Sequence, residues 1–219
     1  MSEAAAHLDL GGRKFAVRQA KISGWLNALP QTYAVGLGWT VEVECEGVEY
    51  DDEWWEPRSY CEFFHLPVRS WRALEGQAVT WNGDVPVSEG PRALYLWEHG
   101  TMARGDLSIG RREGTLFDLR WTGLADVHFD GAFGADVPFD VACQAQFTDI
   151  RVLAPGVLDG SALRSLLSAE LDLSGLSLTE VQQQPSHRVK AAKGLLGGLF
   201  GRDRHPTLNT LATFRPADA

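Results

Sequence analysis

The fold class is decided by residues 115–147, TLFDLRWTGLADVHFDGAFGADVPFDVACQAQF. Side chains alternate between the two faces of a β-strand, so apolar residues at positions of one parity predict one buried face. Here the odd positions are apolar and the even positions are mostly polar or charged, on both sides of the turn signal Asp130-Gly131. We therefore predict two long antiparallel strands with one buried and one solvated face. The apolar set is Phe117, Leu119, Trp121, Ala125, Val127, Phe129, Val137, Phe139, Val141, Cys143, Ala145 and Phe147.

The same kind of pattern extends outward over residues 8–153, where short apolar runs are separated by glycine-containing turn signals. Trp39, Val41 and Val43 alternate with polar residues, and the parity of the apolar positions changes after Gly47. Such a change is typical of a bulge or a tight turn. The chain is thus expected to be mainly β, with an antiparallel β-sandwich or flattened barrel over residues 1–156.

A different pattern begins after Pro155. Leucines at 163, 166, 167 and 171 have helical spacing and predict a helix over residues 161–171. Residues 177–180, SLTE, have the form of a capping box and predict a second short helix that ends before Pro185. We expect a helical and Gly/basic appendage over 157–205, followed by a tail or final strand over 206–219.

Composition limits the classes of partner. The net charge is −9 over 219 residues, which argues against nucleic acid and makes a basic protein partner electrostatically easier. Three cysteines without CxxC spacing favour neither a disulfide framework nor a zinc knuckle. Cys45 and Cys143 fall at core parity, which suits a reducing compartment. Without a visible signal peptide or a transmembrane segment, we expect a cytoplasmic protein.

The densest charge run is acidic and encloses two tryptophans. It contains no Lys or Arg, and its acids are Glu42, Glu44, Glu46, Glu49, Asp51, Asp52, Glu53 and Glu56. One interpretation is structural, in which Arg13, Lys14, Arg18 or Lys21 on a neighbouring strand pairs with these acids. The other is a docking surface for a basic protein, because complementary charge steers association and tryptophans often dominate binding energy. The predicted partner-binding residues are Glu42, Glu44, Glu49, Asp51, Asp52, Glu53, Trp54 and Trp55.

A second candidate site lies at the tip of the 115–147 hairpin. If residues 131–135 connect its strands, Asp126 faces Asp140 and Asp130 faces Asp136. Like charges directly opposite are destabilising by roughly 0.2–1 kcal/mol, which a divalent cation would offset. Carboxylates suit Ca²⁺ or Mg²⁺, and a histidine shifts the preference toward a transition metal. The predicted ligands are Asp126, His128, Asp130, Asp136 and Asp140, and the alternative is a solvated tip with another register.

No nucleophile elbow, HExxH or P-loop motif occurs in the sequence. The first functional hypothesis is therefore a non-enzymatic protein-binding module with an acidic face, for which an immunity or antitoxin-like role is the most concrete version. The second is a metal-binding domain or metal-dependent enzyme that uses the 126–140 hairpin. The third is a small-ligand or carbohydrate-binding β-sandwich that uses its tryptophans, and no other cofactor is expected.

Overall fold

The structure is a computed structural model that describes residues 6–29, 35–50, 52–83, 92–95, 99–127, 134–185 and 208–217. It is mostly β, which confirms the predicted class. The strands and helices of the described residues are β1 (His7–Leu10), β2 (Arg13–Asn27), β3 (Gly36–Cys45), β4 (Val48–Tyr50), β5 (Glu53–Trp55), β6 (Arg58–Phe64), η1 (Trp71–Leu74), β7 (Ala78–Asn82), β8 (Arg92–Tyr95), β9 (His99–Thr101), β10 (Arg104–Glu113), β11 (Leu116–Ala125), β12 (Val137–Pro155), α1 (Gly160–Glu170), β13 (Leu176–Pro185) and β14 (Leu208–Pro216).

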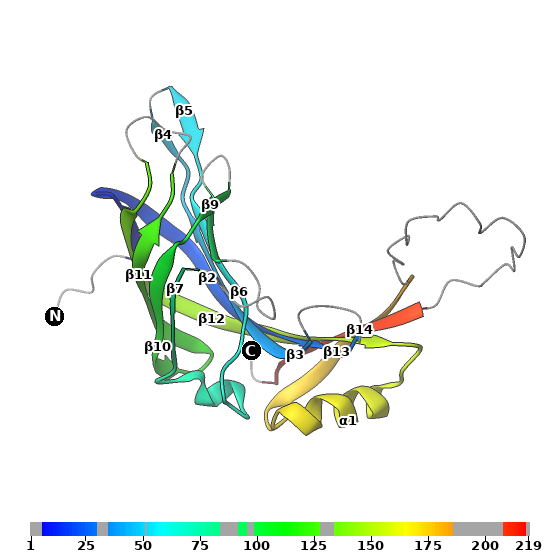
Figure 1. Cartoon of the computed structure of the whole chain (residues 1–219). Helices are drawn as coiled ribbons and strands as arrows, with labels where there is room; N and C mark the ends of the chain where they lie inside the picture. Colours follow the sequence, from blue (N-terminus) through cyan, green and yellow to red (C-terminus); the bar gives the residue numbers. More distant parts are fainter. Residues whose placement is uncertain are drawn as a thin grey trace, which may run out of the picture.

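Twelve strands form one curled sheet, a half-barrel, and β4 and β5 form a separate two-stranded sheet. The strand order is β7-β10-β11-β12-β1-β2-β3-β6-β8-β9, with β14 joined to β12 and β13 joined to β14. Neighbours are antiparallel except β2 and β12, which pair in parallel beyond the N-terminal end of β1. Figure 1 shows an upright curled body and an arm that extends to one side of it. We use "arm" for α1, β13, β14 and the parts of β2, β3 and β12 that lie with them.

The predicted parity of the core is confirmed. Every residue of the predicted apolar set is buried except Cys143, which is partly exposed, and Phe129, which lies outside the described residues. Trp121 is fully buried, with its ring edge-on to Trp81 and Phe139 at centroid distances of 6.1 and 5.8 Å. After Phe147 the buried parity changes, because β12 carries an irregularity at this point of its pairing with β2. The second half of β12 therefore turns even-numbered residues inward.

The predicted hairpin register is wrong by four positions. Ala125 pairs with Val137, where the predicted register pairs it with Val141, and Asp140 pairs with Thr122 and not with Asp126. A shift by an even number of residues leaves every side chain on the same face of the sheet. The prediction of the buried face was therefore correct although the prediction of opposite residues was not.

The first predicted helix is confirmed as α1, whose N-terminus is capped by the Asp159 carboxylate accepting a hydrogen bond from the Ala162 N–H at 2.8 Å. Leu163 and Leu167 on α1 are buried and belong to the hydrophobic core. The second predicted helix is wrong, because residues 177–180 belong to β13 and pair antiparallel with β14. The local capping pattern is overridden by this ladder. The possible final strand is confirmed as β14, whereas the glycine-rich residues 186–207 lie outside the described residues.

Candidate functional site

The acidic run forms a hairpin at the end of the body farthest from α1 (Figure 1). β3 leads into β4 through Glu46 and Gly47, and β5 leads out to β6. Glu49 pairs with Trp54 across the two strands. The turn contains Asp52 with a φ of 62°, a left-handed conformation that aspartate tolerates better than most residues. This tight turn lets the hairpin project beyond the large sheet.

The two tryptophans of β5 lie on opposite faces of the hairpin, as neighbouring strand residues must. Trp55 is only 2 % exposed and stacks on Phe15, with ring centroids 6.5 Å apart and planes 12° apart. Trp54 is 58 % exposed. Trp55 therefore anchors the hairpin to the core and is not accessible to a partner, which corrects its predicted role. Trp54 is the tryptophan that the hairpin presents to solvent.

The Trp54 side chain is held in place by contacts within the hairpin. Its indole N–H donates to Glu56 Oε1 at 3.3 Å, and the Arg58 guanidinium lies 3.5 Å from the other oxygen of that carboxylate. Gly47 lies under the indole ring, where an added Cβ would overlap the ring atoms. Sequence analysis assigned no such role to Gly47 or Glu56, although the spacing Trp-x-Glu, which places both side chains on one face of an extended chain, could have indicated the second contact.

The acidic residues fall into an inner and an outer group. In the inner group, Glu44 accepts hydrogen bonds from Gln19 and from Arg18, the latter at 3.0 Å. The hydrogen bond from Gln19, together with that from Arg18, lowers the pKa of the Glu44 carboxyl. Glu42 lies opposite Lys21 in the β2–β3 ladder. The structural interpretation thus accounts for these two acids.

The outer group lies on the hairpin itself. Glu49 and Asp52 are exposed, and neither forms an ion pair with another residue of the described ranges. Asp51 and the side chain of Glu53 lie outside what the structure describes. The hairpin therefore combines an exposed, positioned indole with exposed carboxylates that lack a partner among the described residues.

The predicted metal ligands at the other hairpin are only partly brought together. Asp126 Oδ1 accepts a hydrogen bond from the Asp136 backbone N–H at 3.2 Å, whereas Asp140 forms a 2.6 Å ion pair with Arg120. His128 and Asp130 lie outside the described residues. Within the described ranges no three His, Cys, Asp or Glu side chains are grouped so that they could hold a metal ion. The charge of Asp140 is offset by an arginine, and the complete five-residue site stays a prediction.

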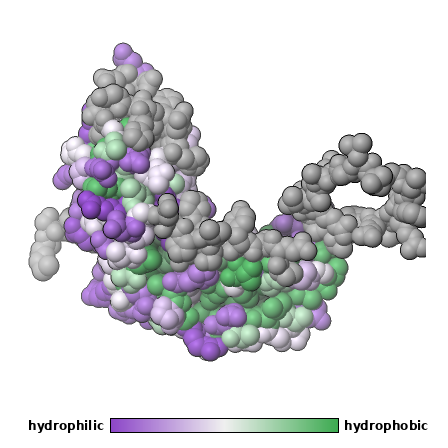
Figure 2. Space-filling view, in the orientation of Figure 1, coloured by the Kyte–Doolittle hydropathy of each residue, from purple (hydrophilic) through white to green (hydrophobic). Residues whose placement is uncertain are grey.

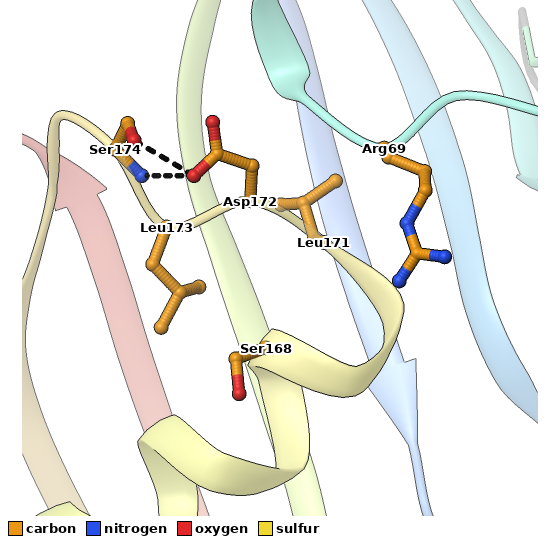
Figure 3. Close-up of a pocket in the computed structure, with 6 residues that line it drawn as sticks. All are labelled: Arg69, Ser168, Leu171, Asp172, Leu173 and Ser174. Atoms are coloured by element: carbon orange, nitrogen blue, oxygen red, sulfur yellow. Dashed lines mark hydrogen bonds between the residues drawn. The ribbon is translucent and has the colours of Figure 1, made fainter.

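A cavity of about 540 Å³ lies where α1 ends, and Figure 3 shows its lining residues. Arg69 donates to the Ala169 carbonyl at 2.8 Å, and the Asp172 N–H donates to the Arg69 carbonyl at 2.7 Å. The Asp172 carboxylate accepts hydrogen bonds from the N–H and hydroxyl of Ser174, and these bonds lower its pKa. The polar groups that line the cavity are thus hydrogen-bonded within the protein, and these bonds hold the segment after α1 in place. We therefore interpret the cavity as structural.

An apolar groove of about 640 Å³ lies beside α1 and is lined in part by Leu26, Val35, Leu158 and Leu166. Figure 2 shows hydrophobic residues gathered over the arm. No tryptophan lines this groove.

Five of the tryptophans are buried in the core, namely Trp39, Trp55, Trp71, Trp81 and Trp121. Sugar binding by the third hypothesis needs a group of exposed tryptophans. Among the described residues, Trp54 is the one tryptophan that is largely exposed.

The cysteines offer little for nucleophilic chemistry. Cys45, Cys61 and Cys143 form no disulfide, and burial raises the pKa of the Cys45 and Cys143 thiols to about 12. Because the thiolate is the nucleophile, both thiols are unreactive near neutral pH.

No helix of the described residues has the length and apolar character needed to cross a membrane. No protein-family model, no curated protein and no solved structure matches this chain.

Proposed function

We propose that this protein is a protein-binding module and that its β4–β5 hairpin docks a basic partner. The observation that carries the proposal is Trp54, which is 58 % exposed yet fixed by Glu56 and Gly47. Tryptophan is strongly enriched among the residues that dominate binding energy at interfaces. A side chain already held in its bound position loses less conformational entropy on association.

Charge supports a basic partner. Glu49 and Asp52 are exposed beside Trp54, and the whole chain carries a net charge of −9. Such a field accelerates the encounter with a positively charged surface and slows the approach of an acidic one. A cytoplasmic immunity or antitoxin-like protein, which covers the basic active surface of an effector, is the most concrete form of the proposal. Three cysteines that form no disulfide agree with a reducing compartment.

The test starts from an unidentified partner. Proteins retained from native cells by the immobilised wild-type chain are identified, and the dissociation constant of each purified candidate is measured for three forms of this protein. Trp54→Ala should weaken binding of the true partner by about 2 kcal/mol or more, which is about 30-fold. Val157→Ala removes another exposed apolar side chain, outside the hairpin, and should bind like the wild type.

The charges should act mainly on the association rate. Asp52→Lys should slow association and reduce its dependence on salt, with a smaller effect on dissociation. The proposal fails if every partner binds Trp54→Ala and Asp52→Lys as tightly as the wild type. It also fails if Val157→Ala weakens the binding of every retained protein as much as Trp54→Ala does.

A further inference from the structure

The large sheet has one long open edge in its described part, at β13. The strands at the two ends of the main strand order, β7 and β9, have five and three residues. β13 has ten residues, and within the described ranges it pairs only with β14. From Ser177 to Pro185 its residues are exposed, with the exception of the partly buried Leu178. In Figure 1, β13 and β14 lie together in the arm above α1.

The direction of the free backbone groups follows from one hydrogen bond. The Gly156 N–H donates to the Leu208 carbonyl at 2.9 Å, so the backbone of Leu208 faces the β12 side of β14. Backbone groups alternate between the two sides of a strand, so Asn209, Leu211 and Thr213 face β13. Their partners in β13 are Gln184, Gln182 and Glu180.

The N–H and C=O groups of Val181 and Gln183 must therefore point toward the open edge. Pro185 is the next residue in this outward series. It has no N–H, and an outward position on an edge strand is one of the few places where a sheet tolerates proline.

Natural edge strands are usually protected by lysines, prolines or bulges. β13 has a bulge between Leu178 and Glu180, and it has Pro185 at its end. Between these two features the sequence Val181-Gln182-Gln183-Gln184 carries no charge. The bulge and Pro185 thus lie on either side of residues 181–184, and these four residues carry no feature that would prevent pairing with another strand.

We propose that the occupant of this edge is a second copy of the chain, paired through antiparallel β13 strands about a two-fold axis at Gln182. Val181 then lies opposite the partner's Gln183, and each such pair exchanges two backbone hydrogen bonds. Glu180 lies opposite the partner's Gln184, so no like charges face each other. The segment is self-complementary, as an interface between identical subunits requires.

Other two-fold registers are less favourable. An axis at Glu180 places Glu180 opposite its own copy, which is repulsive. An axis at Gln183 places Val181 opposite the partner's Pro185, which cannot donate a backbone hydrogen bond. An axis at Val181 places Gln183 opposite the partner's Thr179, which lies in the bulge. The axis at Gln182 keeps the two glutamates apart and leaves the Val181 and Gln183 pairs intact, and Pro185 and the bulge residue Thr179 face each other only at the two ends of the paired segment.

Disulfide cross-linking tests both the dimer and its register. In the proposed pair Gln182 faces the partner's Gln182 at a position without direct backbone hydrogen bonds, where Cα atoms lie about 4.5 Å apart, within the range of a disulfide. Gln182→Cys should form a cross-linked dimer under mild oxidation. Gln184→Cys, which faces Glu180 in the partner, should not, and the wild type controls for the native cysteines. Equal cross-linking of the two variants would overturn the register.

Sedimentation equilibrium of the full chain tests the association itself. The wild type should approach twice the mass of one chain as its concentration rises. Gln183→Pro, which removes an outward N–H and keeps the β13–β14 ladder, should sediment as a monomer, and so should Val181→Lys. Gln184→Ala changes no outward backbone group and should remain dimeric. A wild type that stays monomeric at every concentration, or a dimer that survives both Gln183→Pro and Val181→Lys, refutes the proposal.

Discussion

Replacement of Trp121 by alanine should be among the most destabilising single changes in this protein. Trp121 lies on β11 and is fully buried, and its ring packs edge-on against Trp81 and Phe139. Its indole N–H is buried and lacks a hydrogen-bond partner among the described residues. The side chain therefore stabilises the fold through apolar burial and ring contacts, and part of that gain is offset by an unpaired donor.

The expected magnitude follows from these two effects. A buried aromatic side chain removes about 200 Å² from water, which at about 25 cal/mol per Å² is worth about 5 kcal/mol. An unpaired buried donor costs about 1–3 kcal/mol, and that cost disappears in the alanine variant. We therefore expect Trp121→Ala to lower the free energy of unfolding by about 3 kcal/mol, at the lower end of the range for such substitutions. Trp121→Phe retains a ring and removes the donor, so it should cost less than about 1.5 kcal/mol.

Urea unfolding followed by far-ultraviolet circular dichroism gives both values, with the m-value checked for constancy. Trp54→Ala is the matched control, because this exposed tryptophan should change the free energy of unfolding by less than about 0.5 kcal/mol. If Trp121→Phe costs as much as Trp121→Ala, the unpaired donor has been wrongly assigned. If Trp121→Ala unfolds at the same urea concentration as the wild type, the assigned strand phase of β11 is wrong.

Three further predictions concern the hairpin, one ion pair and one thiol. Gly47→Ala should displace the Trp54 indole, seen as a shift of its N–H resonance in NMR spectra, while an unchanged resonance would remove Gly47 from the description of the site. The lowered pKa of Glu44 means that its stabilising effect is present above the pKa of the unfolded chain and is lost as the pH falls through the lower folded value. The melting temperature of Glu44→Gln should thus lie below that of the wild type at neutral pH and converge with it in acid, and a constant difference would contradict this cause. Because Cys45 is buried and burial raises the pKa of its thiol to about 12, a thiol reagent at pH 8 should label Cys45 only after unfolding, and rapid labelling of Cys45 in the native protein would contradict its burial.

The sequence predicted the faces of the strands better than their partners. Alternation at Phe117, Leu119 and Trp121 depends only on local geometry, so it identified the buried face of β11 correctly. The register depends on where the connection between β11 and β12 begins, and parity alone does not distinguish shifts of two or four residues. For this reason the sequence wrongly predicted that Asp126 lies opposite Asp140, which in the structure pairs with Thr122.

The candidate site shows the same limit. Alternation implies that Trp54 and Trp55 lie on opposite faces, but only the position of Phe15 decides which of them is buried. The inner acids could be assigned to a neighbouring basic strand in outline, and the structure identifies Arg18 as the partner of Glu44. The capping-box pattern at residues 177–180 misled because β14, which follows later in the chain, supplies a ladder that no local pattern contains.

The parallel contact between β2 and β12 has a consequence for the order of folding. It joins Lys21 to Gln146 and continues to Asn27 and Leu153, so the chain must close a very long loop before these strands meet. Closing such loops is entropically costly, and proteins rich in distant contacts fold slowly. β14 joins the large sheet through β12, and β13 joins it only through β14. The arm should therefore be the last part of the molecule to acquire protection from hydrogen exchange during refolding, with β13 following the body strands.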